Sequence, residues 1–281
     1  MLTLCLLLAL QDRSGVLAEQ LRSDRAEERD RAMRELLKLG EAAVPVVEPL
    51  IHDADVEVAW RARMVFLPHS APMAEGLWQR LEQRLLEARS LRFKVRIESG
   101  GVVLATGEVR IRGGAVNAWI RDPRPEKESF ASIRSDGTRV LVERSRPVTL
   151  NWNNAAPAVD RDAPPGLGPE FIRCFARVGI QTTLSACSNL LAGGGKWDLT
   201  STLKARSHRM LFIGDWNSGI GFQVPVAGNL LEQQLTVQPG KDTVTSRRVL
   251  QGGTLVLTEI YDEFVLNEDL PDGPFQLPAG K

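Results

Sequence analysis

The chain has 281 residues, of which 43% are hydrophobic and 25% charged, a composition typical of globular proteins with a sizeable core. Lys plus Arg and Asp plus Glu both number 35, so the net charge is zero. This balance argues against a nucleic-acid-binding protein, which usually carries a basic excess. No segment approaches the roughly 18 uninterrupted apolar residues of a transmembrane helix.

The first segment of the chain is apolar and short. Leu2 to Leu10 is apolar except for Thr3, and charge begins at Asp12. The run resembles the hydrophobic region of a secretory signal peptide. We therefore predict that residues 1–11 are a signal peptide, although no Lys or Arg precedes the run and "LAL-Q" is a poor cleavage site. The alternative is a short buried N-terminal helix.

Export would leave two cysteines in the mature chain, Cys174 and Cys187. An even pair in an oxidising compartment suggests a disulfide. On one continuous helix the two residues would lie about 20 Å apart, so a bridge requires a chain reversal between them. Gly179 is suited to that reversal. The alternative is two buried free cysteines.

The sequence predicts a helical segment at 14–68. Apolar residues recur at helical spacing up to Gly40, followed by a short apolar helix with two prolines, an Asp-rich turn and a third helix. The order in "LLKLGEAAVPVVEPLIHDADVEVAWRARMVFL" resembles a HEAT repeat over about one and a half units. Because solenoids generally need three or more repeats, we expect this segment to pack against the rest of the chain or a partner.

A sheet is predicted after an amphipathic helix at 77–91. In "LRFKVRIE" apolar and polar residues alternate without a break, and the pairs Gly100-Gly101, Gly113-Gly114 and Asp136-Gly137 indicate hairpin turns. A helical insert at 169–191, interrupted by Gly179, separates two groups of strands. The pattern predicts an α+β fold: a strongly curved antiparallel sheet of about 10–11 strands, a half-open β-barrel, covered by helices and preceded by the HEAT-like segment.

The last segment, "VLNEDLPDGPFQLPAG", cannot form a regular strand, yet it keeps apolar residues. We expect it to form an extended strap across the end of the sheet, held by Leu270, Phe275 and Leu277. Pro271 and Pro278 would stop it from adding an open edge strand.

Three stretches resemble the LolA/LolB/LppX-like family of exported lipoprotein-sorting proteins. They are "LEARSLRFKVRIESGG", "SFASIRSDGTRVLVE" and the end of the chain from Leu235, where Asn267, Phe275, Pro278 and Gly280 occupy the places of the family's closing pattern. The resemblance covers residues 72–281. It implies an unclosed barrel with an apolar cavity beneath a helical lid, in which acyl chains of lipids or lipoproteins are held, and a periplasmic or otherwise extracytoplasmic location.

A lipid cavity needs apolar walls with a few polar groups at the mouth. The large aromatic residues of the sheet and the insert are the candidates. For any single one of them ordinary core packing is the favoured interpretation, and only their collective number points to a cavity. They are Phe93, Trp119, Trp152, Phe171, Phe175, Phe212, Trp216 and Phe222.

Catalytic patterns are absent from the sequence. The three histidines, His52, His69 and His208, have no G-x-S-x-G context, and no Cys/His set has zinc spacing. "AGGGKW" lacks the Walker spacing of a phosphate loop. We therefore predict no enzyme, no cofactor and no metal.

The sequence thus predicts an exported, non-enzymatic protein that binds a lipid or lipidated ligand as an envelope carrier or sensor. Its expected partners are acyl chains and an envelope protein that binds through residues 14–68. The alternative is a protein–protein interaction module in which the HEAT-like helices bind a partner and the sheet is only a scaffold.

Overall fold

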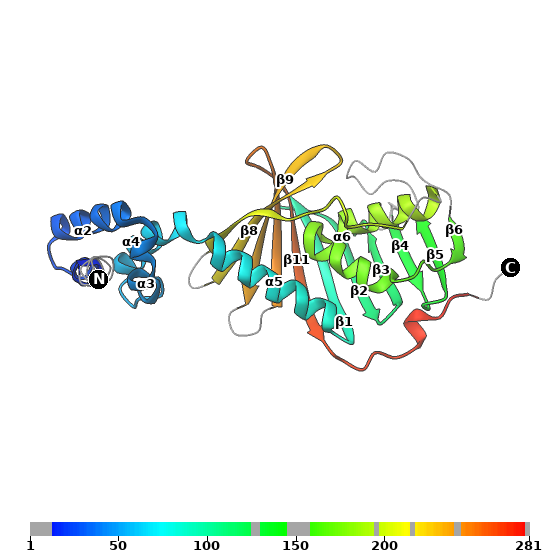
Figure 1. Cartoon of the computed structure of the whole chain (residues 1–281). Coiled ribbons are helices and arrows are strands. Elements are labelled where there is room, and N and C mark those ends of the chain that lie inside the picture. Colours follow the sequence, from blue (N-terminus) through cyan, green and yellow to red (C-terminus); the bar gives the residue numbers. More distant parts are fainter. Residues whose placement is uncertain are drawn as a thin grey trace. The chain divides into compact units, whose positions relative to one another are not determined.

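The computed structural model describes residues 13–124, 130–144, 158–193, 197–213, 217–238 and 243–278 (Figure 1). The predicted signal peptide lies outside these residues. The chain divides into two compact units, 1–75 with 208–218 and 76–207 with 219–281. The structure assigns residues 208–218 to the first unit as well. The domains predicted from the sequence, 14–68 and 72–281, stay a prediction.

The first unit is helical. Residues 13–20 form a helix, and short helices follow. They are α2 (Ala26–Leu39), η1 (Gly40–Ala43), α3 (Val44–Val47), η2 (Glu48–Leu50), α4 (Val56–Phe66) and η3 (Leu67–His69). Asp55 caps α4, since its carboxylate accepts hydrogen bonds from the backbone N–H of Glu57 at 2.8 Å and of Val58 at 3.3 Å. Helices form where the pattern predicts them, and their assignment as a HEAT repeat stays a prediction.

The strands form one open antiparallel sheet, as the alternating pattern predicts. They are β1 (Ser90–Ser99), β2 (Val102–Arg112), β3 (Ala115–Arg121), β4 (Phe130–Ser135), β5 (Arg139–Arg144), β6 (Val159–Asp162), β7 (Arg206–Ile213), β8 (Asn217–Val226), β9 (Asn229–Gln238), β10 (Thr243–Gln251) and β11 (Thr254–Leu266). Their order is β6-β5-β4-β3-β2-β1-β11-β10-β9-β8-β7. Two meanders are therefore joined side by side through the first and last strands.

The pairing of β1 with β11 joins the two meanders. Val95 lies opposite Tyr261 and Ile97 opposite Glu259 in the antiparallel register. The apolar face of β1 that the alternation predicts, Leu91, Phe93, Val95 and Ile97, is buried. The centre of the core therefore lies on β1 and its two neighbours, far from the sheet's free edges.

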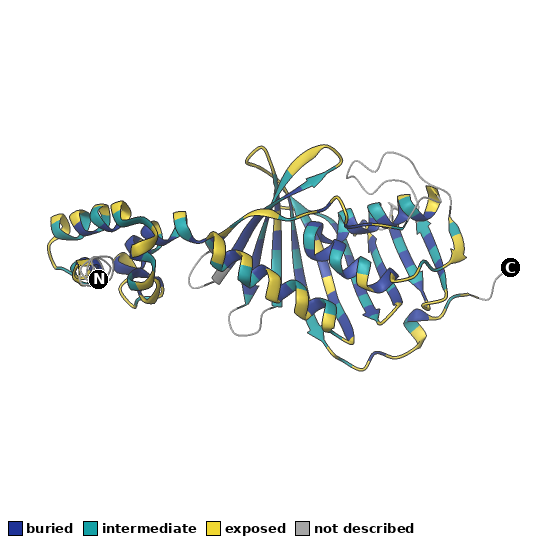
Figure 2. Ribbon diagram, viewed as in Figure 1, coloured by how far each residue is buried: buried dark blue, intermediate teal, exposed yellow. Residues whose placement is uncertain are grey.

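Two helices, α5 (Ala71–Glu87) and α6 (Leu167–Gly193), cover one face of the sheet in the second unit (Figure 1). Figure 2 shows buried residues along the strands beneath them. Trp78 and Leu81 of α5 are buried, and the Trp78 ring lies 4.5 Å from the ring of Phe222. Among the described residues, no helix combines the length and hydrophobicity that crossing a membrane would require.

The segment after β11 is anchored at several points. Leu270 and Phe275 form a buried cluster with Ala115. Arg112 donates a hydrogen bond to the Leu270 carbonyl at 2.7 Å, and its guanidinium lies 5.1 Å from the Phe275 ring centroid. The Asn117 amide donates to the Pro274 carbonyl at 2.8 Å. Leu270 and Phe275 are therefore structural anchors on the ends of β2 and β3, and the anchoring role of Leu277 stays a prediction.

We expect Phe275→Ala to lower the free energy of unfolding by about 3 kcal/mol, because it removes a buried ring and leaves a cavity. Urea denaturation followed by circular dichroism measures the change. Gln276→Ala, at the exposed neighbouring position, is the matched control and should leave stability nearly unchanged. Equal effects of the two substitutions would contradict the anchoring role.

Candidate functional site

The helix α6 is broken at Gly179. This residue has φ +82° and ψ 175°, outside the helical region, so two helices meet there as the sequence predicts. A Cβ atom at this position would lie 2.4 Å from a carboxylate oxygen of Glu259, so only glycine fits. The break leaves backbone carbonyl groups at the end of the first half, and backbone N–H groups at the start of the second half, without partners inside the helix. These groups are buried and need other hydrogen-bond partners.

Arg247 and Glu259 satisfy these buried helix ends. They are direct cross-strand partners on β10 and β11, and both are 1% exposed. Arg247 donates to the carbonyls of Phe175 at 2.9 Å, Ala176 at 2.7 Å and Arg177 at 3.2 Å.

Glu259 accepts the backbone N–H groups of Ile180 at 3.1 Å and Gln181 at 3.2 Å. A cation thus lies at the C-terminus of the first half of α6 and an anion at the N-terminus of the second, as the helix dipoles favour. We call this pair of residues the helix clamp.

Tyr261 and Gln233 complete the hydrogen bonding of the clamp. The Tyr261 hydroxyl donates to Glu259 and accepts from Arg247 Nε at 3.2 Å, and Gln233 Oε1 accepts from Arg247 Nη1 at 2.8 Å. Burial, and then the adjacent Glu259 carboxylate, raise the pKa of Tyr261 well above its ordinary value. Tyr261 therefore stays a neutral donor, and the clamp is a structural polar network.

Cys174 and Cys187 lie on opposite sides of the break in α6. Both are free and buried in the structure, as in the alternative interpretation of two buried free cysteines. Burial raises the pKa of the Cys174 thiol to about 11, so it is not a thiolate nucleophile at neutral pH. The disulfide stays a prediction for an oxidised form.

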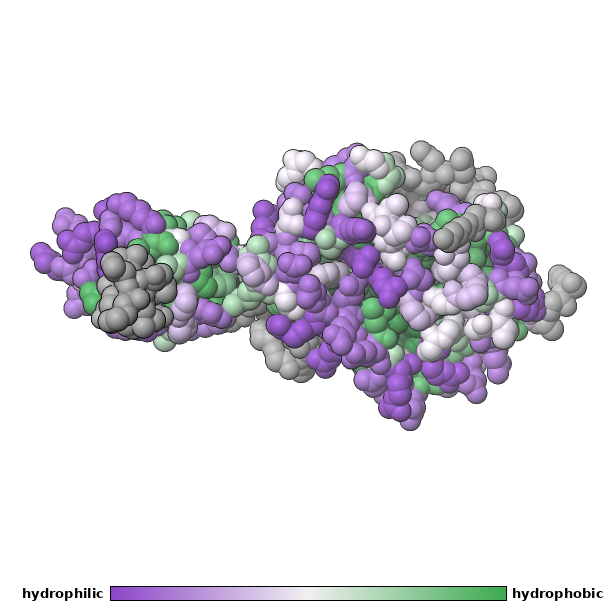
Figure 3. Space-filling view, viewed as in Figure 1, coloured by the Kyte–Doolittle hydropathy of each residue, from purple (hydrophilic) through white to green (hydrophobic). Residues whose placement is uncertain are grey.

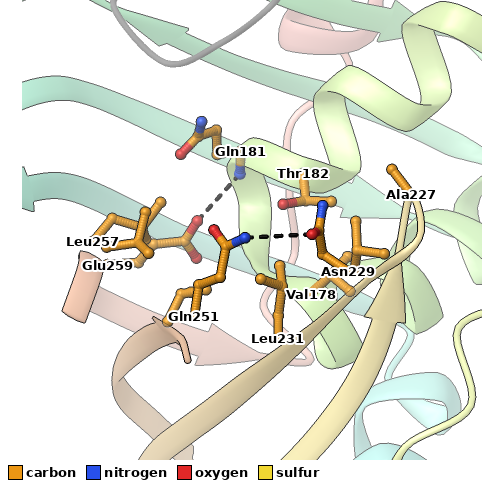
Figure 4. A pocket seen from close by; sticks show the side chains of 12 residues that line it. Val178, Gln181, Thr182, Ala227, Asn229, Leu231, Gln251, Leu257 and Glu259 are labelled. Atoms are coloured by element: carbon orange, nitrogen blue, oxygen red, sulfur yellow. Dashed lines mark hydrogen bonds between the residues drawn. The ribbon is translucent and has the colours of Figure 1, made fainter. Parts of the chain in front are cut away.

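A pocket of 210 Å³ lies between α6, on both sides of its break, and the strands β8 to β11 (Figure 4). Its deep part is buried and largely apolar, and exposed residues of two hairpins border its mouth. The lining residues are Val178, Gln181, Thr182, Val226, Ala227, Asn229, Leu231, Val249, Gln251, Val256, Leu257 and Glu259.

The polar groups of the pocket are few and mostly uncharged. At the mouth the Gln251 amide donates to the Asn229 side-chain oxygen at 3.4 Å (Figure 4). At the base Glu259 is held by the backbone N–H of Gln181, as Figure 4 also shows. An apolar hollow with amides at its entrance can bind the apolar part of a ligand and orient the polar end of that ligand.

Most of the predicted aromatic residues that the structure describes belong to the packed core. The Phe93 ring stacks 4.7 Å from Phe175 and 5.3 Å from Phe264, and Phe171 and Phe222 are fully buried. Of the five whose side chains the structure describes, Phe93, Trp119, Phe171, Phe175 and Phe222, none lines the pocket at α6. Their contact with a ligand stays a prediction.

The other predicted aromatic residues lie elsewhere. Trp119 borders a separate hollow of 280 Å³ together with Lys94, Arg96, Glu108 and Asp262, and the Arg121 guanidinium lies 5.3 Å from its ring centroid. Phe212 belongs to β7 and its side chain is not described, while Trp152 and Trp216 lie outside the described residues.

An apolar patch also reaches the surface. Figure 3, on the face that α5 and α6 cover, shows hydrophobic side chains in an area bordered by hydrophilic residues. Half-buried Phe264 stacks on Phe93 at an interplanar angle of 10°. Phe264 is thus a partly exposed edge of the aromatic core.

The histidines form no metal centre in the described part of the chain, where no group of three His, Cys, Asp or Glu side chains could hold a metal ion. Burial lowers the pKa of His208, which therefore favours its neutral form. The pocket at α6 could not be predicted from the sequence, because its residues come from three separate segments, one in α6 and one in each of two hairpins. The one available signal was the absence of charge from the two hairpins at 226–231 and 249–257.

No protein-family model matches the chain, and no curated protein matches it. Among solved structures, it is similar to MucB with 12% identity and a TM-score of 0.38, over 74% of this chain and 64% of MucB. The chain thus spans less than two thirds of MucB, which has also been solved in complex with MucA(peri).

Two other solved structures are similar to the chain over most of their own length. An uncharacterised conserved protein from Thermus thermophilus has 10% identity and a TM-score of 0.38, over 73% of this chain and 94% of that one. LprF from Mycobacterium bovis has 8% identity and a TM-score of 0.36, over 75% and 99%. At these identities and TM-scores the similarities assign neither a family nor a function to the chain.

The helix clamp predicts a specific pattern of stability changes. Arg247→Met and Glu259→Gln should each lower the free energy of unfolding by about 3 kcal/mol, because each leaves a buried partner group unsatisfied. The double variant should lose less free energy of unfolding than the two single variants lose together, since the two side chains belong to one hydrogen-bond network. Urea denaturation of the three variants gives this coupling energy.

Arg248→Met is the matched control for this cycle, because Arg248 is the exposed neighbour on the opposite face of β10. Its effect should lie within about 0.5 kcal/mol. Additive single effects at Arg247 and Glu259 would show that the two residues do not act as a pair.

Proposed function

We propose that the protein binds a lipid or lipidated ligand without chemistry, as a carrier or sensor at the bacterial envelope. The observation that carries the proposal is the 210 Å³ pocket between α6 and the sheet, with Val178, Val249 and Leu257 buried inside it. The clamp keeps the second half of α6 above the strands, so the walls do not collapse onto each other.

The size of the pocket limits what enters it. An apolar cavity of about 150 Å³ suffices for benzene, whereas pockets for drug-sized ligands span about 300–1,000 Å³. The pocket therefore suits one end of a single acyl chain. Each buried CH₂ group would contribute about 0.8 kcal/mol to binding.

The rest of a longer ligand would extend along the helix-covered face. We propose that the sheet acts there as a half-open barrel and that the aromatic residues around Phe93 and Phe175 meet the ligand beneath α5 and α6. The apolar patch in Figure 3 supports this path. Removal of residues 1–11 as a signal peptide and a periplasmic location belong to the same proposal.

Blocking the pocket tests the proposal. Leu231→Trp should reduce uptake of acyl ligands by about tenfold or more, because Leu231 lines the pocket and the larger side chain would fill it. Native mass spectrometry of delipidated protein titrated with lipids measures uptake.

The matched control is Leu230→Trp. Leu230 is exposed and, as the preceding residue in β9, points to the other face of the sheet. The Leu230→Trp variant should retain full lipid uptake. If the delipidated wild-type protein takes up no lipid, or if Leu231→Trp retains full uptake, the pocket is not the ligand site.

A second candidate function is protein binding through the first unit. Val56, Trp60 and Met64 of α4 are 77%, 51% and 42% exposed, and their spacing of four residues places them on one stripe of the helix. Exposed apolar side chains gathered on one face are typical of protein interaction sites. In this alternative the sheet is a scaffold.

Trp60→Glu separates the two functions. Under the alternative, it should abolish pull-down of the partner proteins that the wild-type chain retains from extracts of its native host, while lipid uptake stays unchanged. Arg34→Glu, at an exposed position of α2, controls for the added charge. Retention of the same proteins by wild type and Trp60→Glu would exclude the stripe as the binding surface.

A further inference from the structure

The pocket at α6 is enclosed by segments without charge. Neither hairpin segment that borders it, 226–231 or 249–257, contains a Lys, Arg, His, Asp or Glu. This is unusual for exposed turns in a chain of which 25% is charged. A ligand entering between the two hairpins meets amides, a hydroxyl and apolar side chains.

The one charged side chain among the twelve lining residues is Glu259 at the base. Its oxygens already accept two backbone N–H groups and the Tyr261 hydroxyl, and Arg247 Nε lies 3.9 Å from one of them. The buried pair is therefore neutral as a unit and offers no free charge to a ligand. Either sign of ligand charge would be desolvated there without a partner.

One lining residue carries a buried acceptor without a partner. Gln181 Oε1 is buried without a hydrogen-bond partner among the described residues, and Gln181 belongs to the lining. Buried acceptors normally find a donor. A ligand that carries an amide N–H or a hydroxyl group supplies one, whereas a carboxylate or phosphate does not.

We propose that the ligand of this pocket is uncharged where it enters: an acyl or alkyl chain whose polar end is an amide or an alcohol. A fatty-acid carboxylate, a phosphate headgroup or a quaternary ammonium is disfavoured. The inference rests on the proposed function and adds to it the chemical class of the ligand.

Three probes with the same ten-carbon chain test the inference: 1-decanol, decanoate and decyltrimethylammonium, each below its micelle concentration. Isothermal titration calorimetry of the delipidated full chain measures their dissociation constants. We expect decanol to bind at least about tenfold more tightly than either ion. If either ion binds as tightly as decanol, the inference is overturned and the proposed function stands. If none of the three binds, both are overturned.

A change of charge at the mouth gives the second measurement. Gln251→Lys should strengthen decanoate binding by about threefold and leave decanol binding unchanged, because it places a cation at the entrance. Gln234→Lys is the matched control, since Gln234 lies on β9 with its side chain toward the opposite face of the sheet. Equal responses of decanoate to both variants would contradict an entrance at Gln251.

Discussion

The buried pair of Arg247 and Glu259 is the interaction on which the second unit depends. A helix that is interrupted under a sheet exposes several polar backbone groups to an apolar interior, and leaving each of them unsatisfied costs about 1–3 kcal/mol. Arg247 satisfies the carbonyls before the break and Glu259 the N–H groups after it. The two strands that carry them therefore fix the position of both halves of α6.

The pocket follows from the same arrangement. The second half of α6 supplies Gln181 and Thr182 to the pocket wall, and β10 and β11 supply Val249, Gln251 and Leu257. Because the clamp joins this helix to these two strands, it sets the width of the space between them. A single continuous helix would have no break at which to receive the two charged side chains, and Gly179 is thus required for the site as well as for the fold.

Much of the fold could be predicted from local patterns. The alternation from Leu91 to Ile97 predicts the buried face of β1, the paired glycines predict the hairpins, and Gly179 predicts the break in α6. The clamp could not be predicted in this way. Arg247 and Glu259 lie in strands where a charged residue ordinarily marks the solvent face, and their partners are about 70–80 residues away in the chain, so only the tertiary structure shows why they point inward.

The position of Glu259 links the two roles of the site. One carboxylate is both the cap of the second half of α6 and the base of the pocket. A ligand group that donates a hydrogen bond to it competes with the N–H groups of Ile180 and Gln181, and so weakens the start of that helix. An apolar chain end leaves those bonds intact. The cap therefore favours ligands that bury hydrocarbon against Val249 and Leu257 and direct no hydrogen-bond donor toward Glu259.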